Sequence, residues 1–153
     1  MKIIIAQLAE KKEALYEEKI STKGLFAEND GVKGLFVKLK ALYISKMLIV
    51  NGNITGKVES KCNRCLEFFA AEYEAPFEQS YEITNQDDEI LLDEDIRQAF
   101  LLGLPIKFLC NEQCKGLCDA CGINLNTGKC ECQKKEKITP FSQLKNLINK
   151  KKN

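Results

Sequence analysis

Eight cysteines and no histidine constrain this 153-residue chain more than any other feature of its sequence. The cysteines are separated by short intervals typical of metal ligands in proteins whose thiols stay reduced. Without histidine, Ser-His and Cys-His catalysis and every mixed Cys/His metal site are excluded. The sequence therefore predicts two four-cysteine zinc sites, with the ligands Cys62, Cys65, Cys110, Cys114, Cys118, Cys121, Cys130 and Cys132.

The eight cysteines can be shared between two Zn²⁺ ions in more than one way. The pairing that we favour joins 118/121/130/132 in a compact C-terminal site and 62/65/110/114 in a second site. A rival pairing joins 110/114/118/121 and 62/65/130/132. The favoured pairing closes one site locally and needs a single long-range connection. Each four-thiolate site would be structural rather than catalytic, because it leaves no open coordination position.

Three other uses of these cysteines fit the chain less well. A thioredoxin-like redox pair at Cys62 and Cys65 should open a helix, but alternating apolar stretches lie on both sides of this pair. The spacing from Cys114 to Cys121 resembles that of radical enzymes with an iron–sulfur cluster, which need a large α/β barrel. A disulfide framework would need export, and the apolar residues 3–6 are too few for a signal peptide. No apolar run approaches the roughly 18–20 residues of a membrane span, so we expect a cytoplasmic protein.

Three stretches with an apolar residue at every second position predict β-strands. They run from Leu35 to Ile44, from Leu48 to Val58 and from Phe69 to Ile83. Gly52 and Gly56 interrupt the second stretch and indicate a bulge or a close approach of another segment. Consecutive long strands of this kind favour an antiparallel meander with one solvated face. Aromatic residues of the third stretch are expected in the core: Phe68, Phe69 and Tyr81.

Short helices complete an α+β fold. A strand over residues 2–5 precedes a helix over about 7–19, with Leu8, Leu15 and Tyr16 on its inner side.

A second helix is predicted from the N-cap residue Asp93 to Gly103, with Pro105 beyond its end. Its apolar stripe is Leu92, Ile96, Ala99 and Phe100. A third helix opens at Thr139-Pro140 and presents Phe141, Leu144, Leu147 and Ile148 on one face.

The chain is expected to divide into three parts. Residues 1–109 form the α+β domain with the antiparallel sheet. Residues 110–132 hold six cysteines and no hydrophobic periodicity, so we expect a zinc-ribbon-like element that packs on the sheet and is ordered by its metal. Residues 133–153 form a basic C-terminal helix or tail.

Charge is segregated along the chain. The net charge is +5 over residues 1–66, −10 over 67–100, zero over 101–132 and +6 over 133–153. Two zinc ions on eight thiolates would change the total from +1 to −3, so any contact with RNA depends on local basic residues. We predict this contact from Lys57, Lys61, Arg64, Lys129, Lys134, Lys135, Lys137, Lys150, Lys151 and Lys152.

These motifs together resemble those of the YceD family. The resemblance rests on residues 62–67 after a β-run, on Ile90-Leu91-Leu92 to Leu104-Pro105, and on Leu109-Cys110 to Cys132. The most characteristic line is Cys118-Asp119-Ala120-Cys121-Gly122-Ile123-Asn124-Leu125-Asn126, in which the family often has proline in place of Asp119. Phe141 to Leu147 resembles the closing helix of the family, and the first 30 or so residues match it weakly.

The resemblance implies a bacterial and plastid protein that is needed for accumulation of large-subunit ribosomal RNA. It brings no known catalytic residue, and we expect a non-enzymatic factor that contacts 23S rRNA or a pre-ribosomal particle. The alternative is a zinc-stabilised module in which the zinc elements and the acidic stretch 67–95 bind a basic ribosomal protein or another assembly factor. Neither hypothesis requires a small-molecule substrate or a membrane.

Overall fold

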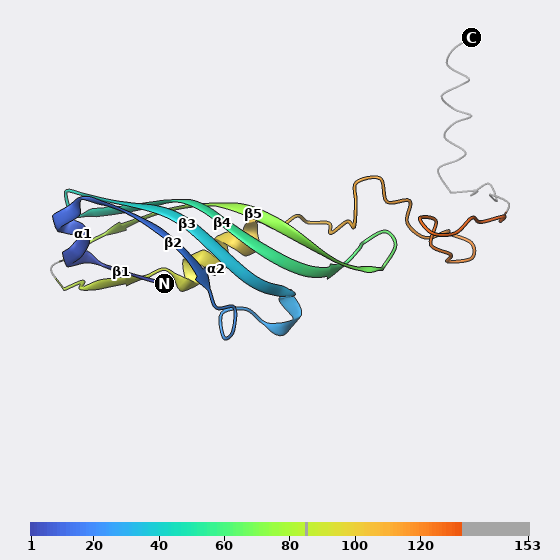
Figure 1. The fold of residues 1–153 in the computed structure, drawn as a ribbon, viewed down its shortest axis with the longest axis horizontal. Coiled ribbons are helices and arrows are strands. Elements are labelled where there is room, and N and C mark those ends of the chain that lie inside the picture. The colour runs from blue at the N-terminus through green and yellow to red at the C-terminus, as the bar shows by residue number, and fades with distance from the viewer. Residues whose placement is uncertain (85, 133–153) are drawn as a thin grey trace, which may run out of the picture.

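The computed structural model describes residues 1–84 and 86–132, in which a long twisted antiparallel sheet is covered on one face (Figure 1). Its four strands lie in the order β2-β3-β4-β5. They are β2 (Glu13–Ile20), β3 (Val32–Ile44), β4 (Met47–Lys61) and β5 (Phe68–Glu82). A smaller antiparallel pair joins β1 (Lys2–Ile4) to β6 (Glu89–Leu91). The helices are α1 (Ile5–Lys11), the 3₁₀ helix η1 (Glu28–Asp30) and α2 (Asp93–Gly103).

The predicted antiparallel meander of an α+β fold is confirmed. Strands β3, β4 and β5 follow one another and pair as the alternating patterns indicate. The apolar residues of each pattern point to one face, which we call the inner face of the sheet, and the charged residues point to the outer face. The core lies between the inner face and the elements α1, α2, β1 and β6.

Gly56 is where the predicted close approach occurs. A Cβ built on Gly56 would lie 2.2 Å from Cζ of Phe100, the largest buried side chain of α2. The Phe100 ring also contacts Phe26 edge-to-face at a centroid distance of 6.2 Å. The glycine thus lets α2 pack directly on the backbone of β4, which fixes the segment that follows α2.

The helix predicted over residues 7–19 is wrong beyond its first turns. Helix α1 ends at Lys11, and Lys12 takes a left-handed conformation with φ of 63°. The following residues form β2, which pairs with β3 and adds a fourth strand to the sheet. Leu8 is buried and Tyr16 is half-buried, as expected, but Leu15 is 72% exposed on the outer face.

Cross-strand charge pairs explain why this stretch is a strand. Glu17 pairs with Lys38 at 2.8 Å, and Glu13 pairs with Lys40 at 3.0 Å. In a helix these glutamates would have no such partners, whereas opposite charges on facing positions, as for Glu17 and Lys38, or on diagonal positions, as for Glu13 and Lys40, stabilise a sheet. Tertiary pairing here overrides the helix preference of a Glu-, Ala- and Lys-rich stretch.

Three further details differ from the sequence expectations or lie beyond the described residues. Helix α2 has Leu92 as its N-cap, so Asp93 is instead its first helical residue. Phe68 is 76% exposed, so its predicted place in the core is wrong, whereas Phe69 and Tyr81 are half-buried. The predicted helix from Thr139 lies outside the described residues.

Residues 110–132 continue beyond the hairpin of β4 and β5 along the long axis of the molecule (Figure 1). Their backbone hydrogen bonds to the sheet domain are made at the turn between β4 and β5. The division of the chain at residues 109 and 132 stays a prediction. Among residues 1–84 and 86–132, no helix is long and apolar enough to cross a membrane.

Candidate metal centres

The structure gathers the eight thiols into two groups of four. Within each group all sulfur atoms lie within 4.8 Å of one another. We call Cys62, Cys65, Cys110 and Cys114 the inner cluster, because it adjoins the sheet, and Cys118, Cys121, Cys130 and Cys132 the outer cluster. This is the favoured pairing of the sequence analysis, and the rival pairing is absent from the described residues.

The inner cluster joins the β4–β5 turn to the segment that follows α2. Cys62 and Cys65 come from the turn, in which the Cys62 amide donates to the Glu67 carbonyl at 2.9 Å. The amide of Leu66 donates to the Cys62 carbonyl, also at 2.9 Å, and Leu66 has a φ of 61°. This tight reversal points both cysteine sulfurs of the turn toward the same place.

Asn63 attaches the incoming segment to the turn. Its amide donates to the Phe108 carbonyl at 2.8 Å, and its side-chain oxygen accepts from the Phe108 amide at 2.9 Å. The Phe108 ring in turn contacts Tyr73 on β5 edge-to-face, at a centroid distance of 5.7 Å. These contacts position Cys110 two residues later.

Arg64 closes the inner cluster from the other side. Its Nη1 donates to the carbonyls of Glu112 and Cys114 at 3.1 and 3.0 Å. Its own carbonyl accepts from the Leu117 amide at 3.2 Å. Arg64 therefore holds the 112–117 loop against the turn and positions the ligand Cys114, a structural role that the sequence did not predict.

The outer cluster is built on the short loop between Cys118 and Cys130. The Cys118 amide donates to the Ile123 carbonyl and the Gly122 amide to the Cys118 carbonyl, both at 2.9 Å. Gly122 has a φ of 74°, a conformation in which glycine is favoured. The loop thereby returns Cys130 to within 3.2 Å of Cys118.

Asn126 links the two clusters and was missed by the sequence analysis. Its Nδ2 lies 3.3 Å from the Cys114 sulfur, and its Oδ1 accepts from the Lys115 amide at 2.8 Å. An asparagine side chain from the outer loop thus stabilises a ligand of the inner cluster. Its place in the characteristic line of residues 118–126 was the only signal in the sequence.

Within each cluster, the surroundings lower the pKa of one cysteine and raise the pKa of another. Burial opposes ionisation of Cys62, but backbone amides including that of Arg64 outweigh it and lower its pKa to about 6. Burial and the neighbouring sulfur of Cys114 raise the pKa of Cys110 to about 12.

In the outer cluster, the amides of Cys121 and Ala120 lower the pKa of Cys118 to about 6. The neighbouring Cys118 sulfur is the main reason why the pKa of Cys130 is raised to about 12. A cation among the four sulfurs removes this mutual repulsion.

The sulfur positions of the inner cluster agree with tetrahedral metal coordination, and no disulfide joins the eight cysteines in the structure. Tetrahedral Zn–S bonds of about 2.3 Å place neighbouring sulfurs about 3.8 Å apart. In the inner cluster, the distances Cys62–Cys114 and Cys65–Cys110 are both 3.7 Å. The shortest distance in the outer cluster, 3.2 Å, is still far above the S–S bond length of about 2.0 Å. All eight cysteines are free, so both clusters could hold metal ions.

Four of the ten predicted RNA-binding residues are in the part of the chain that the structure describes, and we call the region that holds them, from the end of β4 to the outer cluster, the distal half of the molecule. Lys57 and Lys61 are exposed on β4, Arg64 lies in the β4–β5 turn, and Lys129 is exposed beside the outer cluster. The Lys61 ammonium lies 4.7 Å from the centroid of the Phe68 ring. The remaining six lysines of the prediction lie outside the described residues: Lys134, Lys135, Lys137, Lys150, Lys151 and Lys152.

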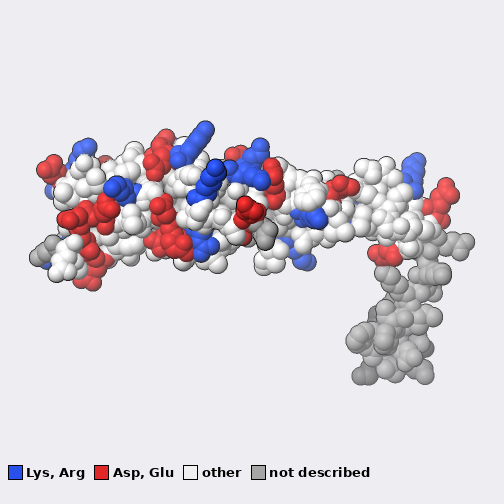
Figure 2. All heavy atoms as spheres, turned by 90° about the horizontal axis from the view of Figure 1, so that it is seen from below, with Lys and Arg blue, Asp and Glu red and all other residues white. Residues whose placement is uncertain are grey.

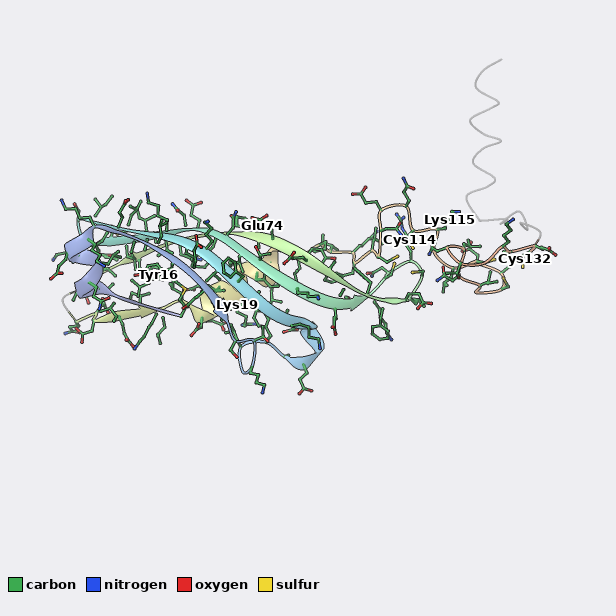
Figure 3. The ribbon with its side chains drawn as sticks, viewed as in Figure 1. Tyr16, Lys19, Glu74, Cys114, Lys115 and Cys132 are labelled. Atoms are coloured by element: carbon green, nitrogen blue, oxygen red, sulfur yellow. The ribbon has the colours of Figure 1, made fainter. Side chains whose placement is uncertain are left out.

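Basic and acidic side chains are interspersed along the face in Figure 2, without a large surface of one sign. Lys107 and Lys115 are further exposed cations near the inner cluster that the sequence analysis did not include. Figure 3 shows Lys115 next to Cys114.

The family comparison concerns the C-terminal half of the chain. The family model described as Large ribosomal RNA subunit accumulation protein YceD matches residues 78–148. This region begins in β5 and includes six of the eight clustered cysteines, whereas Cys62 and Cys65 precede it.

Two curated plant proteins are similar to part of the chain, and both are named Large ribosomal RNA subunit accumulation protein YCED homolog 1, chloroplastic. The protein from Arabidopsis thaliana is 41% identical over 59 residues, which are 39% of this chain and 18% of that protein. The protein from Zea mays is 40% identical over 63 residues, which are 40% of this chain and 21% of that protein. The matched stretch thus spans about a fifth of the length of these relatives. No solved structure matches the chain. Over residues 78–148, the chain is thus similar to the YceD family.

Proposed function

We propose that this chain is a zinc-binding, non-catalytic factor in the accumulation of large-subunit ribosomal RNA, and that it contacts 23S rRNA in the cytoplasm of a bacterium. The observation that carries the proposal is the coincidence of the family match with the cysteine-rich element: the region that resembles rRNA accumulation proteins contains the whole outer cluster and half of the inner one. The family is named for rRNA accumulation and not for a reaction.

The choice of zinc follows from the ligands. Four thiolates without histidine, carboxylate or an open position are typical of structural Zn²⁺ sites. The 3.7 Å sulfur separations of the inner cluster agree with tetrahedral Zn–S geometry. A zinc ion in each cluster would make the cysteine-rich element a zinc-ribbon-like support for the surface around it, and the ions would have no part in a reaction.

We assign RNA contact to the distal half of the molecule. Lys57, Lys61 and Lys129 are exposed there and can contact phosphates, as can the lysines predicted beyond residue 132. Phe68 adds a feature that the sequence analysis did not foresee: a ring 76% exposed with an ammonium beside it can stack on an unpaired base. Interspersed charges (Figure 2) mean that a few such contacts, and not net charge, would determine affinity.

A second candidate function is supported by the outer face of β5. Glu72, Glu74, Glu78 and Glu82 are exposed on this edge strand and make the β5 edge of the outer face acidic. Such a row suits a basic ribosomal protein better than RNA. This reading makes the chain a protein-interaction module with the same zinc sites.

Two measurements test the proposal. Metal analysis of the purified chain should find two zinc ions per molecule, and fewer than one would contradict the metal sites. Crosslinking of the tagged chain in cells, followed by sequencing of the attached RNA, should recover 23S rRNA. Recovery of a ribosomal protein without RNA would support the second candidate instead.

A further inference from the structure

The two clusters differ sharply in their access to solvent. In the inner cluster, Cys62, Cys65 and Cys114 are 0%, 4% and 3% exposed. In the outer cluster, Cys121 and Cys132 are exposed and the other two cysteines are half-buried. Figure 3 shows the same contrast in position: Cys114 lies beside the β4–β5 hairpin, and Cys132 lies at the far end of the described chain. A small reactant can therefore reach the outer sulfurs without any opening of the fold.

The outer cluster also has little apolar cover. The inner cluster packs against Phe69 and Leu109 and is continuous with the sheet. Around the outer cluster, Ile123 is 41% exposed and Leu125 is half-buried. A segment with so few buried contacts opens locally at low free-energy cost, so its metal exchanges faster.

The outer sulfurs are also placed for reaction with one another. Cys130 lies 3.5 Å from the exposed Cys121 and 3.2 Å from Cys118. An oxidised Cys121 would therefore find a second thiolate in contact with it.

We propose that the outer cluster is a site of thiol oxidation by peroxides, and that its oxidation releases the outer metal while the inner site stays loaded. This inference rests on the proposed zinc sites. The Cys121 thiolate attacks hydrogen peroxide, the O–O bond breaks, and a sulfenic acid and hydroxide form. The Cys130 thiolate then attacks the Cys121 sulfur, the S–O bond breaks, and a disulfide and a second hydroxide form. Sulfur loses two electrons and peroxide gains them, and the ion leaves because two of its four ligands are gone.

The consequence is a two-part response within one chain. Loss of the outer ion releases Cys118 and Cys132 from the cluster, while the new disulfide keeps residues 121–130, which include Lys129, as a closed loop. The inner ion keeps the β4–β5 turn attached to the segment after α2. Oxidation would thus alter the surface around the outer cluster and leave the sheet folded. A thiol reductant together with zinc would restore the outer site.

The experiment uses the full chain loaded with zinc and treated with hydrogen peroxide, with a chromogenic chelator reporting released metal. Remaining thiols are then alkylated in denaturant with EDTA, and tryptic peptides are mapped. Cleavage after Lys115, Lys129 and Lys134 separates the two halves of the outer cluster into peptides 116–129 and 130–134. Cleavage after Lys61, Arg64 and Lys107 isolates the inner cysteines in other peptides. Untreated protein is the control.

We expect one zinc ion to be released at least about ten times faster than the other. Its release should coincide with a disulfide between peptides 116–129 and 130–134, while Cys62, Cys65, Cys110 and Cys114 are recovered fully alkylated. Equal release of both ions, earlier oxidation of the inner peptides, or release without this disulfide would overturn the inference and leave the zinc proposal intact. A chain purified with fewer than two zinc ions would overturn the metal proposal and the inference with it.

Discussion

Arg64 offers a way to separate the metal site from RNA binding, because lysine at this position keeps the charge and loses the guanidinium fork. In the structure Nη1 holds the carbonyls of Glu112 and Cys114 at 3.1 and 3.0 Å. A hydrogen bond from a charged donor contributes about 1.5–3 kcal/mol to stability. Because Arg64 is exposed, we expect each of its two hydrogen bonds to lie at the lower end of this range. We expect Arg64→Lys to lose about one such bond, about 1.5 kcal/mol or roughly tenfold in zinc affinity of the inner site. Arg64→Ala should lose both, roughly a hundredfold, which is the upper range for residues that support metal ligands.

The assay is zinc competition with a chelator of known affinity, monitored together with RNA binding at several salt concentrations. Arg64→Lys should lower the zinc affinity of the inner site only. It should not change the salt dependence of RNA binding, since the charge is kept. Lys107→Ala is the matched control, because it removes an exposed cation near the same cluster and should leave zinc affinity unchanged. Wild-type zinc affinity in both Arg64 variants would refute the structural role of this side chain.

The remaining predictions concern ligands, RNA and packing. Cys118→Ser should lose one zinc ion and keep the circular dichroism of the sheet, whereas Cys65→Ser should also lower the melting temperature, because it detaches the turn from the segment after α2. Phe68→Ala should weaken binding of single-stranded RNA about tenfold in a fluorescence titration, and Phe36→Ala, on the same face but 39% exposed, should not. Gly56→Ala should lower the free energy of unfolding by about 1–3 kcal/mol in urea, because its methyl group would overlap the buried aromatic ring of α2.

Much of the fold could be predicted from the sequence, because an apolar residue at every second position identifies a strand that is buried on one face. Leu35, Val37 and Leu39 are all buried, as their alternation predicts. The stretch 13–20 was misassigned because its inner positions include glutamate and its outer positions include Leu15. Its strand character depends on lysines of β3 that lie more than twenty residues away. No local window contains that information.

Spacing left two cysteine pairings open, and the one that closes a site locally is the one in the structure, but the residues that support the ligands were not predictable. Arg64 was interpreted as a phosphate contact, with a contact to the acidic stretch as the structural alternative. Its structural role depends on carbonyl groups 48 and 50 residues later in the chain. Phe68 was placed in the core because it begins an apolar run, although the first residue of β5 falls on the outer face. The sequence shows which residues could take part, whereas their partners are set by the fold.

The contacts between the clusters also give the two sites an order of dependence. The outer loop is attached to the rest of the molecule through Leu117, whose amide donates to Arg64, and through Leu125, whose amide donates to Gly116. Both acceptors are in or next to the inner cluster, so the outer element has a fixed position only when the inner cluster is formed. The side chain of Asn126 in turn makes two contacts with the inner cluster and its loop: its Nδ2 lies 3.3 Å from the Cys114 sulfur, and its Oδ1 accepts from the Lys115 amide at 2.8 Å. Loss of the outer metal would therefore weaken the inner site through the contacts of this one side chain, whereas loss of the inner metal would remove the support on which the outer site is built.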